Sequence, residues 1–161
     1  MTDTLTSICE QCTHLNNPQL EFIPDHLVRQ KEIIRRDLVE LVSAAAAGLE
    51  KAVTVLTGSI LEAVLYTFIQ GQEAYIAKRR GDFTFNPEHS LQNYMEIFNR
   101  WFRDQLPDAE LPDFVVSYRD LIHINRELSS PPDICAQASR SMLRILNNLL
   151  GELAKFAGSS P

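Results

Sequence analysis

The chain has 161 residues, of which 45% are hydrophobic and 22% charged, which suits one compact domain with its own core. Fifteen basic and 21 acidic residues give a formal net charge of −6, which excludes a protein that covers DNA or an anionic membrane with a broadly cationic surface. No proline occurs at residues 25–86 and no glycine at residues 82–150, so a β-sandwich or β-barrel with its regular turns is excluded as well.

The N-terminal residues show no clear hydrophobic period and contain an Asn-Asn-Pro turn signal at residues 16–18. We expect a loosely attached arm or short helix at residues 1–23, a single helical domain at residues 24–157 and a tail at residues 158–161. The first residues are polar rather than an apolar leader, and Ser59 and Glu62 interrupt the most apolar run of the chain. We therefore expect a cytoplasmic protein with no membrane partner.

Three cysteines do not form a recognisable site. Cys9 and Cys12 form a C-x-x-C pair two residues before His14, but a zinc site needs four ligands and the sequence offers no second pair. Cys135 stands alone in a helical pattern. We interpret all three as incidental thiols and expect no metal and no cofactor.

Apolar residues at spacings of three, four and seven predict five helical segments. The first begins at residue 24 and bends at Gly48. The second, at residues 49–80, is apolar around most of its circumference, as is typical of a central helix. Ser90 is the expected N-cap of a third helix at residues 91–105, and the last helix follows a Ser-Ser-Pro-Pro-Asp break at residues 129–133. Short connections predict an all-α, up-and-down bundle of four to five helices.

The fourth predicted helix, from about Pro112 through Asn125, carries the residues that suggest chemistry. On a continuous helix, Arg119 and His123 lie one above the other and point away from the apolar stripe that includes Ile122. Arginine binds phosphate with a planar, permanently charged fork, and histidine transfers protons near neutral pH. Such a pair could assist attack of a ribose 2′-hydroxyl on a phosphodiester without a metal, but the same spacing also occurs on ordinary solvated helix faces.

Two segments resemble the HEPN superfamily. Tyr-Arg-Asp-Leu-Ile-His at residues 118–123 precedes a proline-containing turn and a final apolar helix, and Gly-Ser-Ile-Leu-Glu at residues 58–62 is similar to a Gly-Ser-x-Leu-Glu segment in the second helix of related bacterial proteins. Arg119 matches the arginine of the family motif, Asp120 its polar follower and His123 its histidine. Three residues separate Arg119 from His123, in place of the four to six usual in the family.

The resemblance, which covers about residues 25–157, implies an HEPN-like bundle and a metal-independent endoribonuclease of the toxin or defence type. It implies an active site at the interface of a homodimer and a 2′,3′-cyclic phosphate product. Arg119 would clamp the scissile phosphate, His123 would transfer protons and Asp120 would orient Arg119 or its neighbours. The expected partners are RNA, a second copy of the chain and a cognate antitoxin or regulatory protein, but not DNA.

Other residues have two interpretations. Glu62 either lines the site or pairs with Arg119, or it makes a buried hydrogen bond between helices, which is the interpretation we favour. Arg126 either adds affinity for phosphate or is a solvated charge. Trp101, with its phenylalanine neighbours, is interpreted as core rather than as a platform for bases, and the basic residues 78–80 as a helix end rather than an RNA contact.

The alternative to an enzyme is a catalytically inactive helical module that mediates protein association through the same face. The net charge of −6 favours this alternative. Residues 100–144, however, contain six arginines and no lysine, so a small phosphate site built from arginines is compatible with the acidic balance. A third possibility, a nucleotide-binding accessory domain, lacks a phosphate loop in the sequence.

Overall fold

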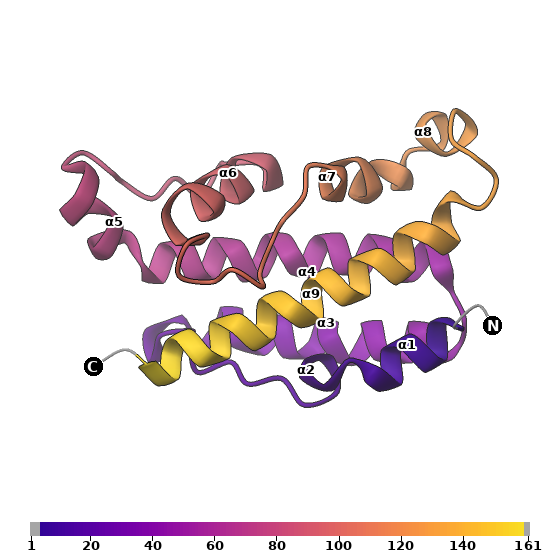
Figure 1. The fold of residues 1–161 in the computed structure, drawn as a ribbon, viewed down its shortest axis with the longest axis horizontal. Helices are drawn as coiled ribbons and strands as arrows, with labels where there is room; N and C mark the ends of the chain where they lie inside the picture. Colours follow the sequence, from indigo (N-terminus) through magenta and orange to yellow (C-terminus); the bar gives the residue numbers. More distant parts are fainter. Residues whose placement is uncertain (1–3, 160–161) are drawn as a thin grey trace.

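The computed structural model describes residues 4–159, and these form an all-α helical bundle, as predicted (Figure 1). No strand occurs in this part of the chain. In chain order the elements are α1 Leu5–Gln11, α2 Thr13–Asn16, the 3₁₀ turn η1 Asp25–Leu27, α3 Val28–Ala46, α4 Glu50–Gly71, α5 Glu73–Arg80, α6 Leu91–Phe102, α7 Phe114–Arg119, the 3₁₀ turn η2 Asp120–Ile122, α8 Ile124–Leu128 and α9 Ile134–Ser159.

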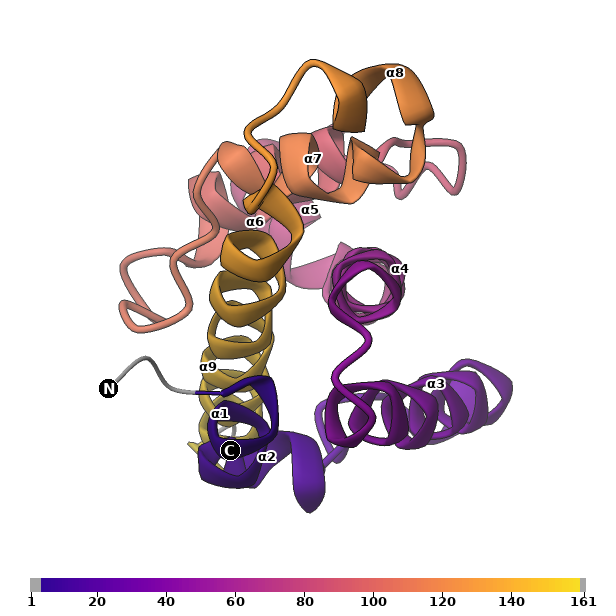
Figure 2. The ribbon, with the colours of Figure 1, turned by 90° about the vertical axis from the view of Figure 1, so that its right-hand side faces the viewer.

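Helix α4 is the central element of the bundle. It contacts α3, α6, α7 and α9, and the view along its axis shows α3 below it, α9 beside it and the layer of α5 to α8 above it (Figure 2). Because it is surrounded, it is apolar on nearly every side, and the hydroxyls of Thr54, Thr57 and Thr67 donate to backbone carbonyls one turn earlier. By length and composition alone α4 could cross a membrane. However, 61% of its most apolar 18-residue stretch is buried inside the bundle, as in a core helix.

An aromatic cluster around Phe68 fixes one end of α4 to its neighbours. The ring centroid of Phe68 lies 4.9 Å from that of Phe102, 5.9 Å from Phe98, 5.6 Å from Phe156 and 6.3 Å from Phe22. These rings come from α6, α9 and the segment before η1, so one residue of the central helix joins three other parts of the chain. Phe98 and Phe102 are core residues, as the sequence predicts.

Of the two alternatives expected for the N-terminal residues, the structure shows short helices for residues 4–23, and these are not loosely attached. Helices α1 and α2 contact both α3 and α9, and their apolar side chains belong to the core, with Ile8 and Leu15 each 2% exposed. Cys9 and Cys12 are buried there, and burial raises the pKa of the Cys12 thiol to about 11, so this thiol stays protonated. The packing of these helices into the core could not be predicted, because two helices this short do not establish a hydrophobic period.

Several predicted boundaries are also wrong. The third helix ends at Phe102 and not at residue 105. The second helix does not run to Arg80, because α4 ends at Gly71 and the chain turns at Gln72 before α5. Gly71 lies against Pro24, and a Cβ atom on Gly71 would be 3.0 Å from Pro24 Cγ. The predicted tail is shorter than expected, since residues 158–159 belong to α9 and residues 160–161 lie outside the described part. The fourth helix is broken, as described below for the site.

The turn between α3 and α4 depends on Gly48, where the sequence predicts a bend. Gly48 has φ +69°, a left-handed conformation that side chains disfavour. Its N–H donates to the Ala45 carbonyl at 3.0 Å, and the N–H of Leu49 donates to the Ala44 carbonyl at 3.0 Å. This pair of bonds is a Schellman motif, so it satisfies the last carbonyls of α3 and reverses the chain into α4.

Replacing Gly48 with Ala should lower the free energy of unfolding by about 1–2 kcal/mol, because the left-handed conformation becomes strained. No atom lies within 4 Å of a Cβ at Gly48, so the loss would be conformational and not steric. Urea unfolding measures it, with Gly158→Ala as the matched control, since Gly158 is equally open and has no positive φ. Equal stability of the two variants would contradict the assigned turn.

Candidate functional site around Arg119

Arg119 lies at the crossing of α7 and α4, where Gly58 leaves room for it. A Cβ atom on Gly58 would be 2.6 Å from Arg119 Cγ and 2.9 Å from Arg119 Cβ, closer than side chains can approach. The aliphatic part of Arg119 therefore rests on the bare backbone of α4. One turn further along α4, Glu62 Oε2 accepts a hydrogen bond from Arg119 Nη2 at 3.1 Å. Gly58 and Glu62 thus hold the two ends of one side chain.

A second carboxylate completes the cluster. Asp120 Oδ1 lies 3.5 Å from Arg119 Nη1. The side chain of Arg119 is 39% exposed, and those of Glu62 and Asp120 are each 31% exposed. Such partly solvated ion pairs are worth about 1 kcal/mol or less, so they orient the guanidinium without sequestering it. Each terminal nitrogen makes one of these contacts, which leaves N–H groups of the guanidinium free to bind another anion.

This geometry decides between the two interpretations of Glu62. Its carboxylate pairs with Arg119 and is not fully buried, so the interpretation that we did not favour describes the contact. The same carboxylate lines a cavity of about 290 Å³ between α3 and α4, together with Gln30, Ser59 and Tyr66. The sequence gives no signal for this cavity, because its walls come from two helices whose relative rotation depends on the packing of the bundle.

The predicted continuous helix through Arg119 and His123 is wrong. Helix α7 ends at Arg119, η2 follows, and His123 has the extended conformation φ −84°, ψ 120°. The tighter 3₁₀ turn carries Leu121 into the core, where it is 3% exposed. The carbonyl of His123 then accepts hydrogen bonds from the N–H groups of Arg126 and Glu127, which begins α8. Arg119 and His123 are therefore neighbours across a turn and not one above the other on a helix.

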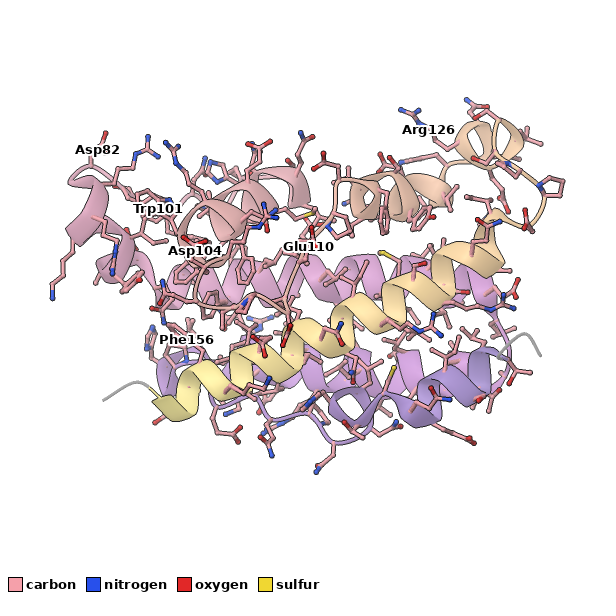
Figure 3. All side chains as sticks on the ribbon, viewed as in Figure 1. Asp82, Trp101, Asp104, Glu110, Arg126 and Phe156 are labelled. Carbon is pink, nitrogen blue, oxygen red and sulfur yellow. The ribbon has the colours of Figure 1, made fainter. Side chains whose placement is uncertain are left out.

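The segment after the turn is exposed. His123 and Arg126 are both solvent-accessible, α8 has no buried residue, and Arg126 points outward at the end of the upper layer (Figure 3). An ion pair between Glu127 and Lys51 attaches α8 to the start of α4, and Cys135 Sγ lies 3.7 Å from Glu127 Oε1. The structure thus gathers Arg119, Glu62 and Asp120 in one cluster and leaves His123 and Arg126 on the adjoining surface.

Sequence reasoning missed an apolar surface on this segment. Ile122 is 44% exposed, Ile124 is 66% exposed and Leu128 is 77% exposed. Ile122 and Ile124 flank His123 in the chain, and Leu128 is the last residue of α8. The sequence places Ile122 in a buried stripe, which is wrong because the stripe requires a helix that continues past Arg119. We call these three side chains the turn patch.

The described residues contain no group of three or more His, Cys, Asp and Glu side chains that could hold a metal ion. Comparisons with protein-family models, curated proteins and solved structures give no match to this chain. The chemistry of the site therefore rests on its own residues.

Gly58→Ala should lower the free energy of unfolding by about 1–3 kcal/mol, because the new methyl group overlaps with Arg119. Ser59→Ala, at the exposed neighbouring position, is the control and should change stability by about 0.5 kcal/mol or less. Denaturant unfolding compares the two, and Gly58→Ala combined with Arg119→Ala should regain part of the loss. Independent, additive losses would contradict the close approach of α7 to α4.

Proposed function

We propose that the chain is an HEPN-like, metal-independent endoribonuclease of the toxin or defence type, with Arg119 and His123 as its catalytic residues. The observation that carries the proposal is the fixed position of the Arg119 side chain. Gly58 and Glu62 hold its guanidinium at the surface, one turn before the exposed His123. A pre-oriented guanidinium is suited to a phosphodiester because it needs little reorganisation to bind two of its oxygens.

The reaction requires two proton transfers. The ribose 2′-hydroxyl loses its proton as its oxygen bonds to phosphorus, and the departing 5′-oxygen gains a proton as the P–O bond breaks, which leaves a 2′,3′-cyclic phosphate and a 5′-hydroxyl. Arg119 balances the charge that develops on the non-bridging oxygens, and His123 moves a proton. Glu62 and Asp120 are positioning residues, since each contacts the guanidinium. Arg126, exposed on α8, adds affinity for a flanking phosphate.

A homodimer supplies what one copy lacks. A single imidazole cannot remove one proton and deliver another in the same step, whereas two copies bring two histidines. The turn patch supports the dimer, because it exposes Ile122, Ile124 and Leu128 beside His123, where association would exclude water from the site. In a toxin, the same surface is the part that a cognate antitoxin would cover.

A second function is favoured by the same patch. Exposed apolar side chains favour burial by a partner whether or not RNA is cleaved. Glu62 and Asp120 already offset the charge of Arg119, which weakens its attraction for a phosphate. A catalytically inactive association module would dimerise through the turn patch and leave RNA intact.

Purified protein should cleave single-stranded RNA in the presence of EDTA, and Arg119→Ala and His123→Ala should each lower the rate about 100-fold or more. Arg29→Ala and His26→Ala are the controls, because Arg29 is exposed on α3 and His26 is exposed on η1. Gel analysis of a labelled RNA measures the rate and the terminal phosphate. Equal rates in all variants, or no cleavage by any of them, would refute the enzyme and leave the association module.

Charge in the turn patch should separate the subunits. Ile124→Asp and Leu128→Asp should convert a dimer into a monomer and lower cleavage, because each places a carboxylate in an apolar contact. Sedimentation velocity reports the mass, and Val39→Asp is the control, since Val39 is an equally exposed apolar residue on α3. A wild-type monomer that cleaves RNA would refute the composite site.

A further inference from the structure

A groove at the end of the bundle opposite α8 combines cations with an aromatic face. It lies between the end of α5, the following loop and α6, and it has a volume of about 370 Å³. Arg80 comes from the last turn of α5, and Arg100 and Trp101 from the last turn of α6. Figure 3 shows Trp101 and Asp82 at this end of the upper layer and Arg126 at the other.

Trp101 differs from its phenylalanine neighbours. Phe98 and Phe102 are fully buried, whereas Trp101 is half-buried: it packs against the core and also lines the groove. The prediction that all three rings belong to the core is confirmed for Phe98 and Phe102 and holds in part for Trp101, which packs against the core with one part of its ring. The guanidinium carbon of Arg100 lies 5.8 Å from the centre of the Trp101 ring system. An indole beside a guanidinium offers a surface for a flat, electron-rich ring.

The two arginines are available to phosphate. The carboxylates of the described residues make no ion pair with Arg100. Arg80 Nε lies 3.3 Å from Asp82 Oδ1, but their side chains are 50% and 78% exposed, so this surface pair is readily exchanged for another anion. Two guanidinium groups and an aromatic ring thus line one groove, and a nucleic acid strand carries phosphates and bases that these two kinds of side chain bind.

Two further polar residues of the groove, Asn93 and Glu96, favour a nucleotide over a simple polyanion. Asn93 Oδ1 accepts from the N–H and the hydroxyl of Ser90 in the cap of α6, which leaves the amide N–H groups of Asn93 to donate. Glu96 Oε1 accepts from Gln92 at 3.2 Å, and its second oxygen remains as an acceptor. A carboxylate in the groove repels a polyphosphate but accepts hydrogen bonds from the N–H groups at the edge of a base.

We propose that this groove binds single-stranded nucleic acid, with a base stacked on Trp101 and its flanking phosphates bound by Arg80 and Arg100. A double helix does not fit this chemistry, because its bases are stacked on one another and are not free to meet Trp101. The inference uses neither Arg119 nor His123 and does not rest on cleavage. If the chain is a ribonuclease, the groove holds a part of the strand remote from the scissile bond.

The test uses a fluorescein-labelled 2′-O-methyl oligoadenylate of five nucleotides, which lacks the hydroxyl needed for cleavage. Trp101 is the single tryptophan of the chain, so quenching of intrinsic fluorescence by the unlabelled oligomer reports on this groove alone. We expect saturable quenching that weakens with added salt and persists in Arg119→Ala. Fluorescence anisotropy of the labelled oligomer then gives the affinity of each variant.

Arg80→Gln and Arg100→Gln should each raise the dissociation constant at least fivefold, and Arg29→Gln, at an exposed position on α3, should leave it unchanged. Trp101→Ala should weaken binding at least fivefold, whereas Trp101→Phe should retain most of it, because an aromatic ring still fills the site and supports the core. The comparison of Trp101→Ala with Trp101→Phe separates loss of base stacking from loss of folding.

Three results would overturn the proposal: no quenching by the oligomer, equal affinities for Arg80→Gln, Arg100→Gln and Arg29→Gln, or equal quenching by a pentaglutamate peptide or by duplex RNA. The peptide result would assign the groove to acidic protein partners. Binding of the oligomer without cleavage of ordinary RNA would refute the proposed enzyme and leave the groove intact, so the two proposals fail separately.

Discussion

The contact of α7 with α4 at Gly58 is the constraint on which the geometry of the candidate site depends. Without a side chain at Gly58, the backbones come close enough for the stem of Arg119 to lie across α4 and for its guanidinium to reach Glu62. Because α7 is held this close to the central helix, the chain must tighten into η2 to place Leu121 in the core. The break at His123 and the exposed turn patch are consequences of that packing.

Signals that act within a few residues could be predicted from the sequence. Gly48 ends α3 in a left-handed conformation, and Ser90 begins α6 with a capping box, both where the sequence places them. These features depend on local backbone chemistry, which the residue type determines directly. The apolar character of α4 likewise indicates its central place.

Features that depend on two distant segments could not be predicted in the same way. The predicted helices continue past Gly71 and past Arg119, whereas α4 ends at Gly71, which lies against Pro24, and α7 ends at Arg119, before Leu121 enters the core. The sequence offers Arg119 and Glu62 as a pair in one of two interpretations, but only the crossing of α7 over α4 brings them together. Trp101 is similar: its helical position suits a core residue, and the loop after α5 leaves it lining a groove.

The arginines explain how an acidic chain can engage an anion. Glu62 and Asp120 fix Arg119, Asp82 loosely pairs with Arg80, and Arg100 lies beside an aromatic ring. Neighbouring side chains therefore orient each of these arginines. The net charge of −6 limits only the number of such arginine sites on the surface. In the proposed enzyme, one end of the upper layer would carry the chemistry and the other would hold the strand.

The central claim is that the guanidinium held by Gly58 and Glu62 binds a phosphodiester. NMR of the arginine Nε–H groups, with the Arg119 signal assigned by its loss in Arg119→Lys, tests this most directly during titration with 2′-O-methyl RNA. We expect the Arg119 signal to shift and reach saturation, and we expect Glu62→Gln to alter the shift. An Arg119 signal that stays fixed while the signals of Arg80 and Arg100 move would contradict this claim.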